Sequence, residues 1–455
     1  MKTTLIKNAN AIVTVDENDT ILRDANILIE GCRIKSIGTQ SWDADQVIDA
    51  SGCFVYPGLV NTHHHLYQTF TRNLPIVQSM ELFPWLVTLY EIWRGLDDDS
   101  VYYSSLIGMG ELLKYGCTTA MDHHYVFPRQ GSEHFIDQQF RAAEDIGMRF
   151  HASRGSMSRG KSDGGLPPDD LVQDIDTILK DSERLVSRYH DTSRCSMRQI
   201  ILAPCSPFSV TTELLKESAD LARRLGVRLH THLCETKDEE AFCLQRVGMR
   251  PLEYMESCGW TGSDVWFAHG IHFNDEELSF LAKTKTGVAH CPVSNMKLAS
   301  GVCRIPDMLR LGVPVGLAVD GSASNDGSNL MAEIRSAYLL HRLSWSAGAP
   351  TGYDLLKIAT RGSAALLGRD DIGSLEVGKA ADLFMIDVTL LELTGAKSDP
   401  GCLLGTVGYS RPAKMVMVSG KVVSQGGQLT TIDEPRVRDK AEALATGLLH
   451  KAGLA

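Results

Sequence analysis

The stretch FVYPGLVNTHHH, residues 54–65, joins an apolar, strand-like run to three consecutive histidines. Successive side chains of a strand point to opposite faces, so His63 and His65 share one face and His64 lies on the other. Two imidazoles on one face suit Zn²⁺ or Fe²⁺. A polar strand end with three hydrogen-bonded histidines explains the same residues. The stretch is consistent with a metal site and with a purely structural strand end. Motifs elsewhere in the chain distinguish the two interpretations.

Further along the chain, short apolar runs alternate with helix-length segments such as 213–225 and 275–282. The apolar runs lie at residues 118–122, 149–153, 199–203, 228–232, 265–269, 287–290 and 314–320. Repeated βα units over roughly 300 residues predict an α/β protein with a (β/α)8 TIM barrel, which we place at residues 58–369. Polar residues follow several of these runs, and the carboxyl ends of barrel strands form the active-site face.

The two ends of the chain share a different pattern. Strand-like runs with turn residues between them fill residues 5–37 and return at 382–387, 414–418 and 421–423. We therefore expect residues 1–57 and 370–455 to form one composite β-sandwich domain. From Pro435 onward the chain is rich in Ala, Leu, Lys and Arg, which predicts a surface helix.

Two other predicted strand ends carry groups that suit metal chemistry. The segment HTHLCE, residues 230–235, places His230 and His232 on one face and Glu235 on the loop above the pocket. A carboxylate beside a metal-activated water can move protons. Asp320 follows an apolar strand, and a carboxylate in a barrel mouth is costly unless a cation compensates it. Taken singly, Glu235 can be a solvated side chain and Asp320 a helix N-cap.

His269 and His290 also end predicted strands. A single histidine at a strand end is more often structural. However, a histidine pair, a His-x-x-Glu segment, a further histidine and an aspartate occur in order, each at a predicted strand end. Independent structural explanations at every one of these positions are harder to accept than one shared site.

Composition limits the classes of function. The chain has 455 residues and a formal net charge of −11, which argues against nucleic acid or an anionic membrane as the main partner. No apolar run is long enough to span a bilayer, and residues 1–8 lack the apolar region of a signal peptide. Eleven scattered cysteines without a Cys-x-x-Cys pair favour a reducing cytoplasm. We expect a small-molecule substrate and a homo-oligomer.

Taken together, these motifs resemble the amidohydrolase superfamily over essentially the whole chain. The carrying segments are residues 57–65 and the run IGSLEVGKAADL, residues 372–383, which looks like the family's return into its β-sandwich. The resemblance implies a distorted TIM barrel and assigns His63, His65, His232 and Asp320 as metal ligands. It also implies Glu235 as proton shuttle, Asp320 as a base beside the attacking water, and His269 as a helper at the water or tetrahedral centre.

The resemblance also implies the number of metal ions. Binuclear members carry a carboxylated lysine on the fourth strand, and residues 199–205 contain no lysine. One divalent ion is therefore expected, Zn²⁺ first and Fe²⁺ second, as in the branch that deaminates purines, pterins and triazines. Cys234 departs from the small or aromatic residue expected between His232 and Glu235.

Within that branch, residues 151–158, 164–169, 203–210 and 320–327 are most similar to the members that deaminate 8-oxoguanine to urate and ammonia. Candidates for reading the ring are Gln68, which follows His65 by three residues, and Arg154, which follows a predicted strand ending at Ser153. Trp85, Tyr125 and Phe127 are candidates for stacking on it.

Alternatives remain open. They are an s-triazine hydrolase that removes chloride or an alkylamine, an isoxanthopterin or guanine deaminase, and a non-catalytic barrel kept as a binding scaffold. The complete ligand set together with Glu235 argues against the scaffold, which would lose such residues freely.

Overall fold

The computed structural model describes residues 2–454, and at its centre lies an eight-stranded parallel sheet in the order β14-β13-β12-β11-β10-β9-β8-β6. Thr62, just after β6, donates its backbone N–H and its hydroxyl to the Leu317 carbonyl of β14 at 3.3 and 3.0 Å, which brings the two edge strands together. The predicted barrel is confirmed, with its distortion at this seam. The strands are β6 (Leu59–Asn61), β8 (Cys117–Asp122), β9 (Arg149–Ser156), β10 (Arg198–Pro204), β11 (Arg228–Leu233), β12 (Val265–His269), β13 (Gly287–His290) and β14 (Val315–Leu317).

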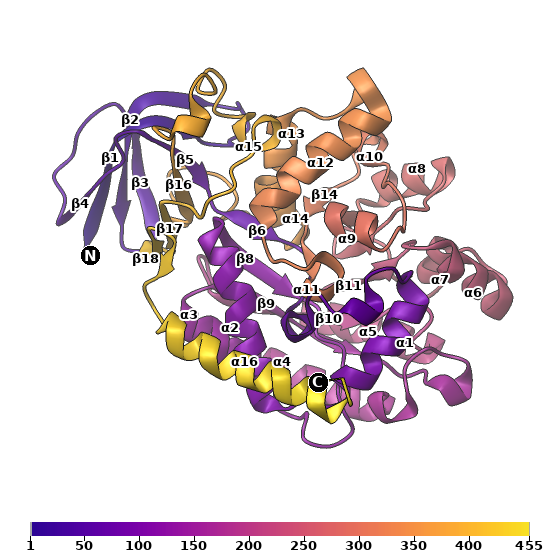
Figure 1. Ribbon diagram of the computed structural model, residues 1–455. Helices are drawn as coiled ribbons and strands as arrows, with labels where there is room; N and C mark the ends of the chain where they lie inside the picture. The colour runs from indigo at the N-terminus through magenta and orange to yellow at the C-terminus, as the bar shows by residue number, and fades with distance from the viewer. Residues whose placement is uncertain (1, 455) are drawn as a thin grey trace.

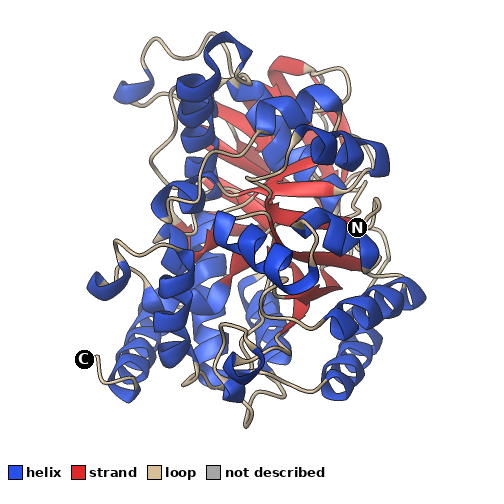
Figure 2. Ribbon diagram, turned by 90° about the vertical axis from the view of Figure 1, so that its right-hand side faces the viewer, coloured by secondary structure: helices blue, strands red, loops and turns tan. Residues whose placement is uncertain are grey.

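Helices surround these strands, as Figure 2 shows. Many start at side-chain caps, such as Thr211 before α5 and Asn274 before α8, which accept backbone N–H groups of the first turn. The helices are α1 (Leu82–Trp93), α2 (Asp98–Lys114), α3 (Phe135–Ile146), α4 (Ile175–Tyr189), α5 (Thr212–Leu225), α6 (Lys237–Val247), α7 (Pro251–Ser257), α8 (Asp275–Thr284), α9 (Pro292–Lys297), α10 (Ile305–Leu311), α11 (Ser322–Asn325), α12 (Leu330–Trp345), α13 (Gly352–Lys357), α14 (Ser363–Leu366), α15 (Leu403–Thr406) and α16 (Glu434–Lys451). Within the described residues, no helix combines the length and the apolar character needed to cross a bilayer.

The two ends of the chain form a second, nine-stranded sheet beside the barrel (Figure 1). Ile27, Val55 and Met385, from both ends, pack into one shared core, while Phe54 and Phe384 on the opposite face join the core of the barrel. The composite sheet is thus confirmed. Its strands are β1 (Thr3–Val13), β2 (Ile21–Glu30), β3 (Arg33–Gly38), β4 (Gln46–Asp49), β5 (Cys53–Pro57), β16 (Leu383–Asp387), β17 (Met415–Val418), β18 (Lys421–Gln425) and β19 (Gln428–Leu429).

The sheet and the barrel are joined by a buried ion pair and a close approach of backbone. Arg149 at the start of β9 pairs with Asp382 just before β16, with Nη2 and Oδ1 3.0 Å apart. Gly116, at φ +81°, lies where a Cβ would come within 2.7 Å of the Phe384 ring. Only glycine fits both the conformation and the space. The exact domain boundaries at residues 57 and 370 stay a prediction.

The predicted C-terminal helix is present as α16, and it packs along α2 on the side of the barrel (Figure 1). Lys114 at the end of α2 forms an ion pair with Glu434 in the first turn of α16. The last helix therefore covers the barrel rather than the sheet that precedes it in the chain.

Candidate metal centre

The first and last strands of the barrel bring two predicted ligand segments side by side. The short strand β7 (His64–His65) pairs in parallel with β15 (Asp320–Gly321), and the backbone N–H of Asp320 donates to the His63 carbonyl at 3.2 Å. His64 points away from the site and bonds the Ser328 hydroxyl through Nε2 at 3.0 Å. The predicted alternation of the three histidines is thus present.

The hydrogen bonds at the far side of each ring set which nitrogen faces the site. His65 and His232 contact the carbonyls of His123 and Cys205 through Nδ1, at 2.7 and 2.6 Å. A carbonyl only accepts, so both Nδ1 atoms carry the proton and both Nε2 atoms carry a lone pair.

The same reasoning reaches His63 through one more ring. His230 Nδ1 donates to the Trp266 carbonyl at 3.0 Å, and burial lowers the pKa of His230 to about 3, so its Nε2 accepts. The donor to it is His63 Nδ1, 2.8 Å away. The Nε2 of His63 therefore carries a lone pair as well, and this atom is buried without a hydrogen bond.

The lone pairs on these nitrogens and the Asp320 carboxylate lie close together, and an arrangement of this kind is stable when a cation lies between them. Asp320 Oδ1 lies 3.1 Å from His63 Nε2 and 3.3 Å from His65 Nε2, and the Nε2 atoms of His65 and His232 are 3.1 Å apart. Ligands about 2.0–2.2 Å from a tetrahedral ion lie about 3.3–3.5 Å from one another. Burial also lowers the pKa of all three histidines, which keeps them neutral and able to ligate. The donor set fits a divalent metal ion.

Two overlapping sets of four groups have ligand atoms within 4.8 Å of one another. One holds His63, His232, His269 and Asp320, and the other holds His63, His65, His123 and His232. The four predicted ligands are divided between these sets, which share His63 and His232. The structure adds His123, at the end of β8, which the sequence prediction omitted.

Three donors fix the carboxylate of Asp320. Ser294 and Ser324 donate their hydroxyls to Oδ2 at 2.5 and 3.0 Å, and the Gly321 N–H donates to Oδ1 at 2.6 Å. Hydrogen bonds to the charged form of a carboxyl favour that form. Asp320 is thus held ionised and in one orientation.

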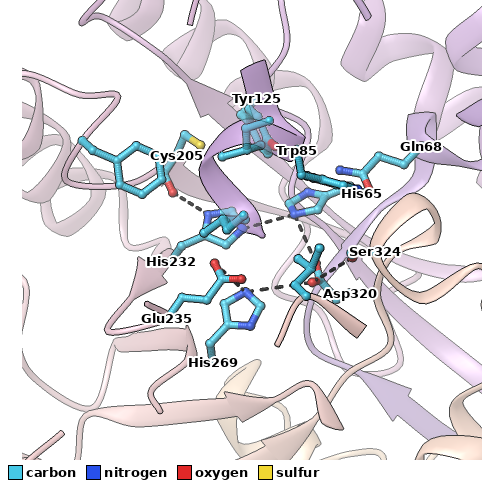
Figure 3. Close-up of a pocket in the computed structure, with 14 residues that line it drawn as sticks. His65, Gln68, Trp85, Tyr125, Cys205, His232, Glu235, His269, Asp320 and Ser324 are labelled. Carbon is cyan, nitrogen blue, oxygen red and sulfur yellow. Dashed lines mark hydrogen bonds and ion pairs between the residues drawn. The ribbon is translucent and has the colours of Figure 1, made fainter. Parts of the chain in front are cut away.

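Glu235 and His269 form a second pair beside the ligands (Figure 3). His269 Nε2 is 3.5 Å from Glu235 Oε2 and 4.0 Å from Asp320 Oδ2, while its Nδ1 bonds Asn295 Oδ1 at 2.9 Å. Burial raises the pKa of Glu235 to about 7. Burial alone would lower the pKa of His269, but the charges of Glu235 and Asp320 outweigh it and raise that pKa. Burial thus favours the protonated form of Glu235, while the neighbouring carboxylates favour the protonated form of His269.

Cys234, His269 and Asp320 all have left-handed backbone, at φ +54°, +71° and +64°. Such strain persists in non-glycine residues only where the surroundings hold it. At Cys234 the holder is Glu239, whose buried carboxylate accepts the N–H groups of Cys234 and Glu235 at 2.8 and 3.3 Å. This turn directs Glu235 toward the site. Cys234 contributes to it through its left-handed backbone and its N–H group.

The pocket over these groups is open to solvent on one side, and its space is about 350 Å³ when the open part is counted. Its walls include Trp85 and Leu86 from α1, and Tyr125, Cys205 and Phe208 from the loops (Figure 3). Gln68 lies at the edge, where its Oε1 accepts the Ala323 N–H at 3.3 Å and its amide NH₂ remains available.

Arg154 and Phe127 do not line this pocket, which corrects the sequence expectation. Strand β9 runs on to Ser156, so Arg154 lies inside the strand and faces outward. Its guanidinium pairs with Asp181 of α4, with Nε and Oδ2 2.6 Å apart, bonds Gln173, and stacks 4.0 Å from the centre of the Phe127 ring. Arg154 therefore ties the barrel to its outer helix.

Comparisons with known proteins agree with this geometry. A model of the amidohydrolase family matches residues 54–423, and the chain belongs to that family. It is 47% identical to the 8-oxoguanine deaminase of Pseudomonas aeruginosa, over 99% of this chain and 100% of the relative. It is also 41% identical to hydroxydechloroatrazine ethylaminohydrolase of Pseudomonas sp. strain ADP, over 99% of this chain and 96% of the relative.

Among solved structures, the chain is similar to the zinc-complexed atrazine chlorohydrolase of Arthrobacter aurescens, with a TM-score of 0.93 and 33% identity over 98% of this chain and 100% of that one. The protein is therefore a metal-binding hydrolase of C–N bonds.

Proposed function

We propose that the protein deaminates 8-oxoguanine to urate and ammonia by metal-assisted hydrolysis. The observation that carries the proposal is the 47% identity to an 8-oxoguanine deaminase over 99% of the chain. The site supports the reaction type, because its ligand atoms, one ionised carboxylate and one carboxyl of raised pKa converge at a single pocket.

We propose one divalent ion per chain, Zn²⁺ with Fe²⁺ as the alternative, held by His63, His65, His232 and Asp320. Such an ion, when bound, lowers the pKa of a coordinated water toward neutrality and so supplies a nucleophile at ordinary pH. His269 is close enough to Asp320 and Glu235 to assist at the attacking water rather than as a permanent ligand.

In the proposed reaction, Asp320 accepts a proton from the attacking water through a carboxylate that two serine hydroxyls hold in place. Glu235, with its pKa near 7, delivers its proton to the ring nitrogen next to the amino-bearing carbon. When the tetrahedral centre collapses, the proton held by Asp320 passes to the leaving amine, which departs as ammonia, and the proton of the new hydroxyl returns to Glu235. His269 stabilises the negative charge that develops on the oxygen of the tetrahedral centre.

Substrate recognition is proposed for groups with free hydrogen-bonding capacity at the pocket. The Gln68 amide NH₂ can donate to a ring carbonyl or nitrogen. The Trp85 indole N–H is buried without a partner, and Tyr125 offers an aromatic wall. An oxidised purine presents an extra carbonyl and N–H, and a site that pairs with them rejects analogues lacking them by orders of magnitude.

A steady-state panel tests the substrate. We expect kcat/KM for ammonia release from 8-oxoguanine to exceed that for guanine, isoxanthopterin, cytosine and aminotriazines, by at least about tenfold, or about 1.4 kcal/mol in transition-state binding. Urate formation is followed in parallel, since it identifies the product directly. If an aminotriazine or isoxanthopterin leads by the same margin, the substrate proposal is wrong while the deaminase mechanism stands.

We also propose that the chain forms homo-oligomers in a reducing, cytoplasmic setting. Leu339 and Leu343, one turn apart on α12, are 50% and 85% exposed and offer an apolar surface to a second copy of the chain. All eleven cysteines are free thiols. Light scattering on the purified protein should give a mass above one chain, and Leu343→Glu should lower it. A monomeric wild type contradicts the proposal.

A further inference from the structure

A second cavity opens at the other end of the barrel from the metal centre. It lies where strands β10 and β11 begin, whereas His232 is near the end of β11. The space is about 800 Å³, counting the part open to solvent. Its polar walls include His190, Arg194, Arg228, Arg369, Asp370 and Asp371. None of these residues takes part in the reaction described above.

Two of the charges in this cavity neutralise each other. Arg369 and Asp371 are buried and joined by two hydrogen bonds, Nε to Oδ1 at 2.8 Å and Nη2 to Oδ2 at 3.0 Å. The same carboxylate also accepts the Cys195 N–H at 2.5 Å. The charge of Asp371 is therefore matched by that of Arg369.

Arg228 has no such partner. Within residues 2–454, its one hydrogen bond runs from Nη1 to the Ser263 carbonyl at 2.6 Å, and no carboxylate lies within 4 Å of it. Partial burial lowers its pKa, opposed only by the more distant charge of Asp264. The guanidinium is thus a half-buried cation that lines a cavity without a counter-ion.

The neighbouring backbone is shaped around this guanidinium. Gly368 has φ +70°, and a Cβ there would lie 2.1 Å from Arg228 Nε. Arg194 lies on the same cavity. Among residues 2–454, the one carboxylate within 4 Å of it is that of Asp370, at 3.8 Å, and the side chain of Asp370 is 90% exposed. His190 accepts the Ile200 N–H through Nδ1 at 3.1 Å, so its Nε2 carries a proton and can donate.

We propose that this cavity binds a small oxyanion, a phosphate or carboxylate group, between Arg228 and Arg194 with His190 as a further donor. A planar guanidinium binds such groups through two parallel N–H···O bonds. The bound anion balances the charge that the protein leaves uncompensated at Arg228. Because the N-terminal face of a TIM barrel serves stability rather than catalysis, the ligand stabilises the fold and leaves the chemistry unchanged.

Calorimetric titration of the metal-loaded wild type tests this, with inorganic phosphate in one arm and acetate in the other, at constant ionic strength set by chloride. We expect saturable binding in one arm or both, and a melting temperature that rises with the anion concentration. The stronger arm identifies the group. Absence of saturable binding in both arms overturns the proposal.

Variants locate the site. Arg228→Met keeps most of the side chain's apolar volume, and should weaken binding by at least about tenfold, the cost of losing a charge-assisted pair of hydrogen bonds. Arg194→Gln, at an exposed position, should weaken it by a smaller factor and decides the matter if Arg228→Met does not fold. Arg223→Gln is the control, since Arg223 is exposed and already paired with Asp264 at 3.2 Å. Equal affinity in Arg194→Gln, Arg228→Met and wild type places the anion elsewhere, such as the metal, and overturns the proposal.

Discussion

His63→Ala should release the metal ion and lower turnover by at least about 10³-fold, the equivalent of about 4 kcal/mol of transition-state stabilisation. The Nε2 of His63 lies 3.1 Å from Asp320 Oδ1 and is buried without a hydrogen bond, so its loss removes a ligand atom from the centre of the set. Metal content measured by mass spectrometry should fall from about one ion per chain to near zero.

His64→Gln is the matched control, because His64 is the adjacent buried histidine but points to Ser328, away from the site. It should keep the ion and most of the activity. Two ions per chain in the wild-type protein would contradict the one-metal proposal. The group of four histidines that includes His123 would then be the candidate for the second ion.

Glu235→Gln should retain the ion and lower kcat by roughly 10²-fold or more, the usual scale for losing a general acid–base group. Glutamine keeps the shape of the side chain but cannot carry the proton. Metal content and melting temperature should stay near wild type, which separates Glu235 from the ligands.

Asp238→Asn serves as its control, since Asp238 is an exposed carboxylate three residues further on, and it should leave kcat unchanged. A Glu235→Gln enzyme that turns over at the wild-type rate would remove Glu235 from the mechanism.

Much of the architecture could be predicted because two simple periodicities control it. The barrel strands carry continuous apolar runs, and the structure places β8, β10, β11, β12 and β13 within a residue or two of the predicted positions. The alternation of side chains along a strand was enough to place His63 and His65 together and His64 apart. Both patterns describe local backbone geometry. That geometry is enough to place the histidine ligands, because each of them lies at the end of a barrel strand.

Arg154 shows where that reasoning failed. Its position depended on a strand end at Ser153, and β9 instead continues to Ser156. Three more residues of pairing with β10 turn Arg154 toward α4, where Asp181 was already available as a partner. The position at which a strand ends depends on its pairing with neighbouring strands. That pairing cannot be inferred from the residues of one strand alone.

The groups that orient the ligands were missed for a related reason. Ser294 reaches Asp320 from helix α9, and His230 reaches His63 across the barrel. His123 had a visible signal, since it follows the apolar strand β8 in the same way that His63 follows its own. Serine hydroxyls carry no such signal, because serine is common in every loop.

The pairing of β7 with β15 has a consequence for how the protein is made. The ribosome produces the His63 segment early, but its partner Asp320 is synthesised only after the eighth barrel strand, β14. Contacts so distant in sequence form late in folding. A nascent chain therefore carries the histidine ligands before it carries Asp320. The ligand set is complete only when β15 has paired with β7. Retention of the ion against a chelator would consequently report that the last strand has docked, so metal uptake marks the completion of folding.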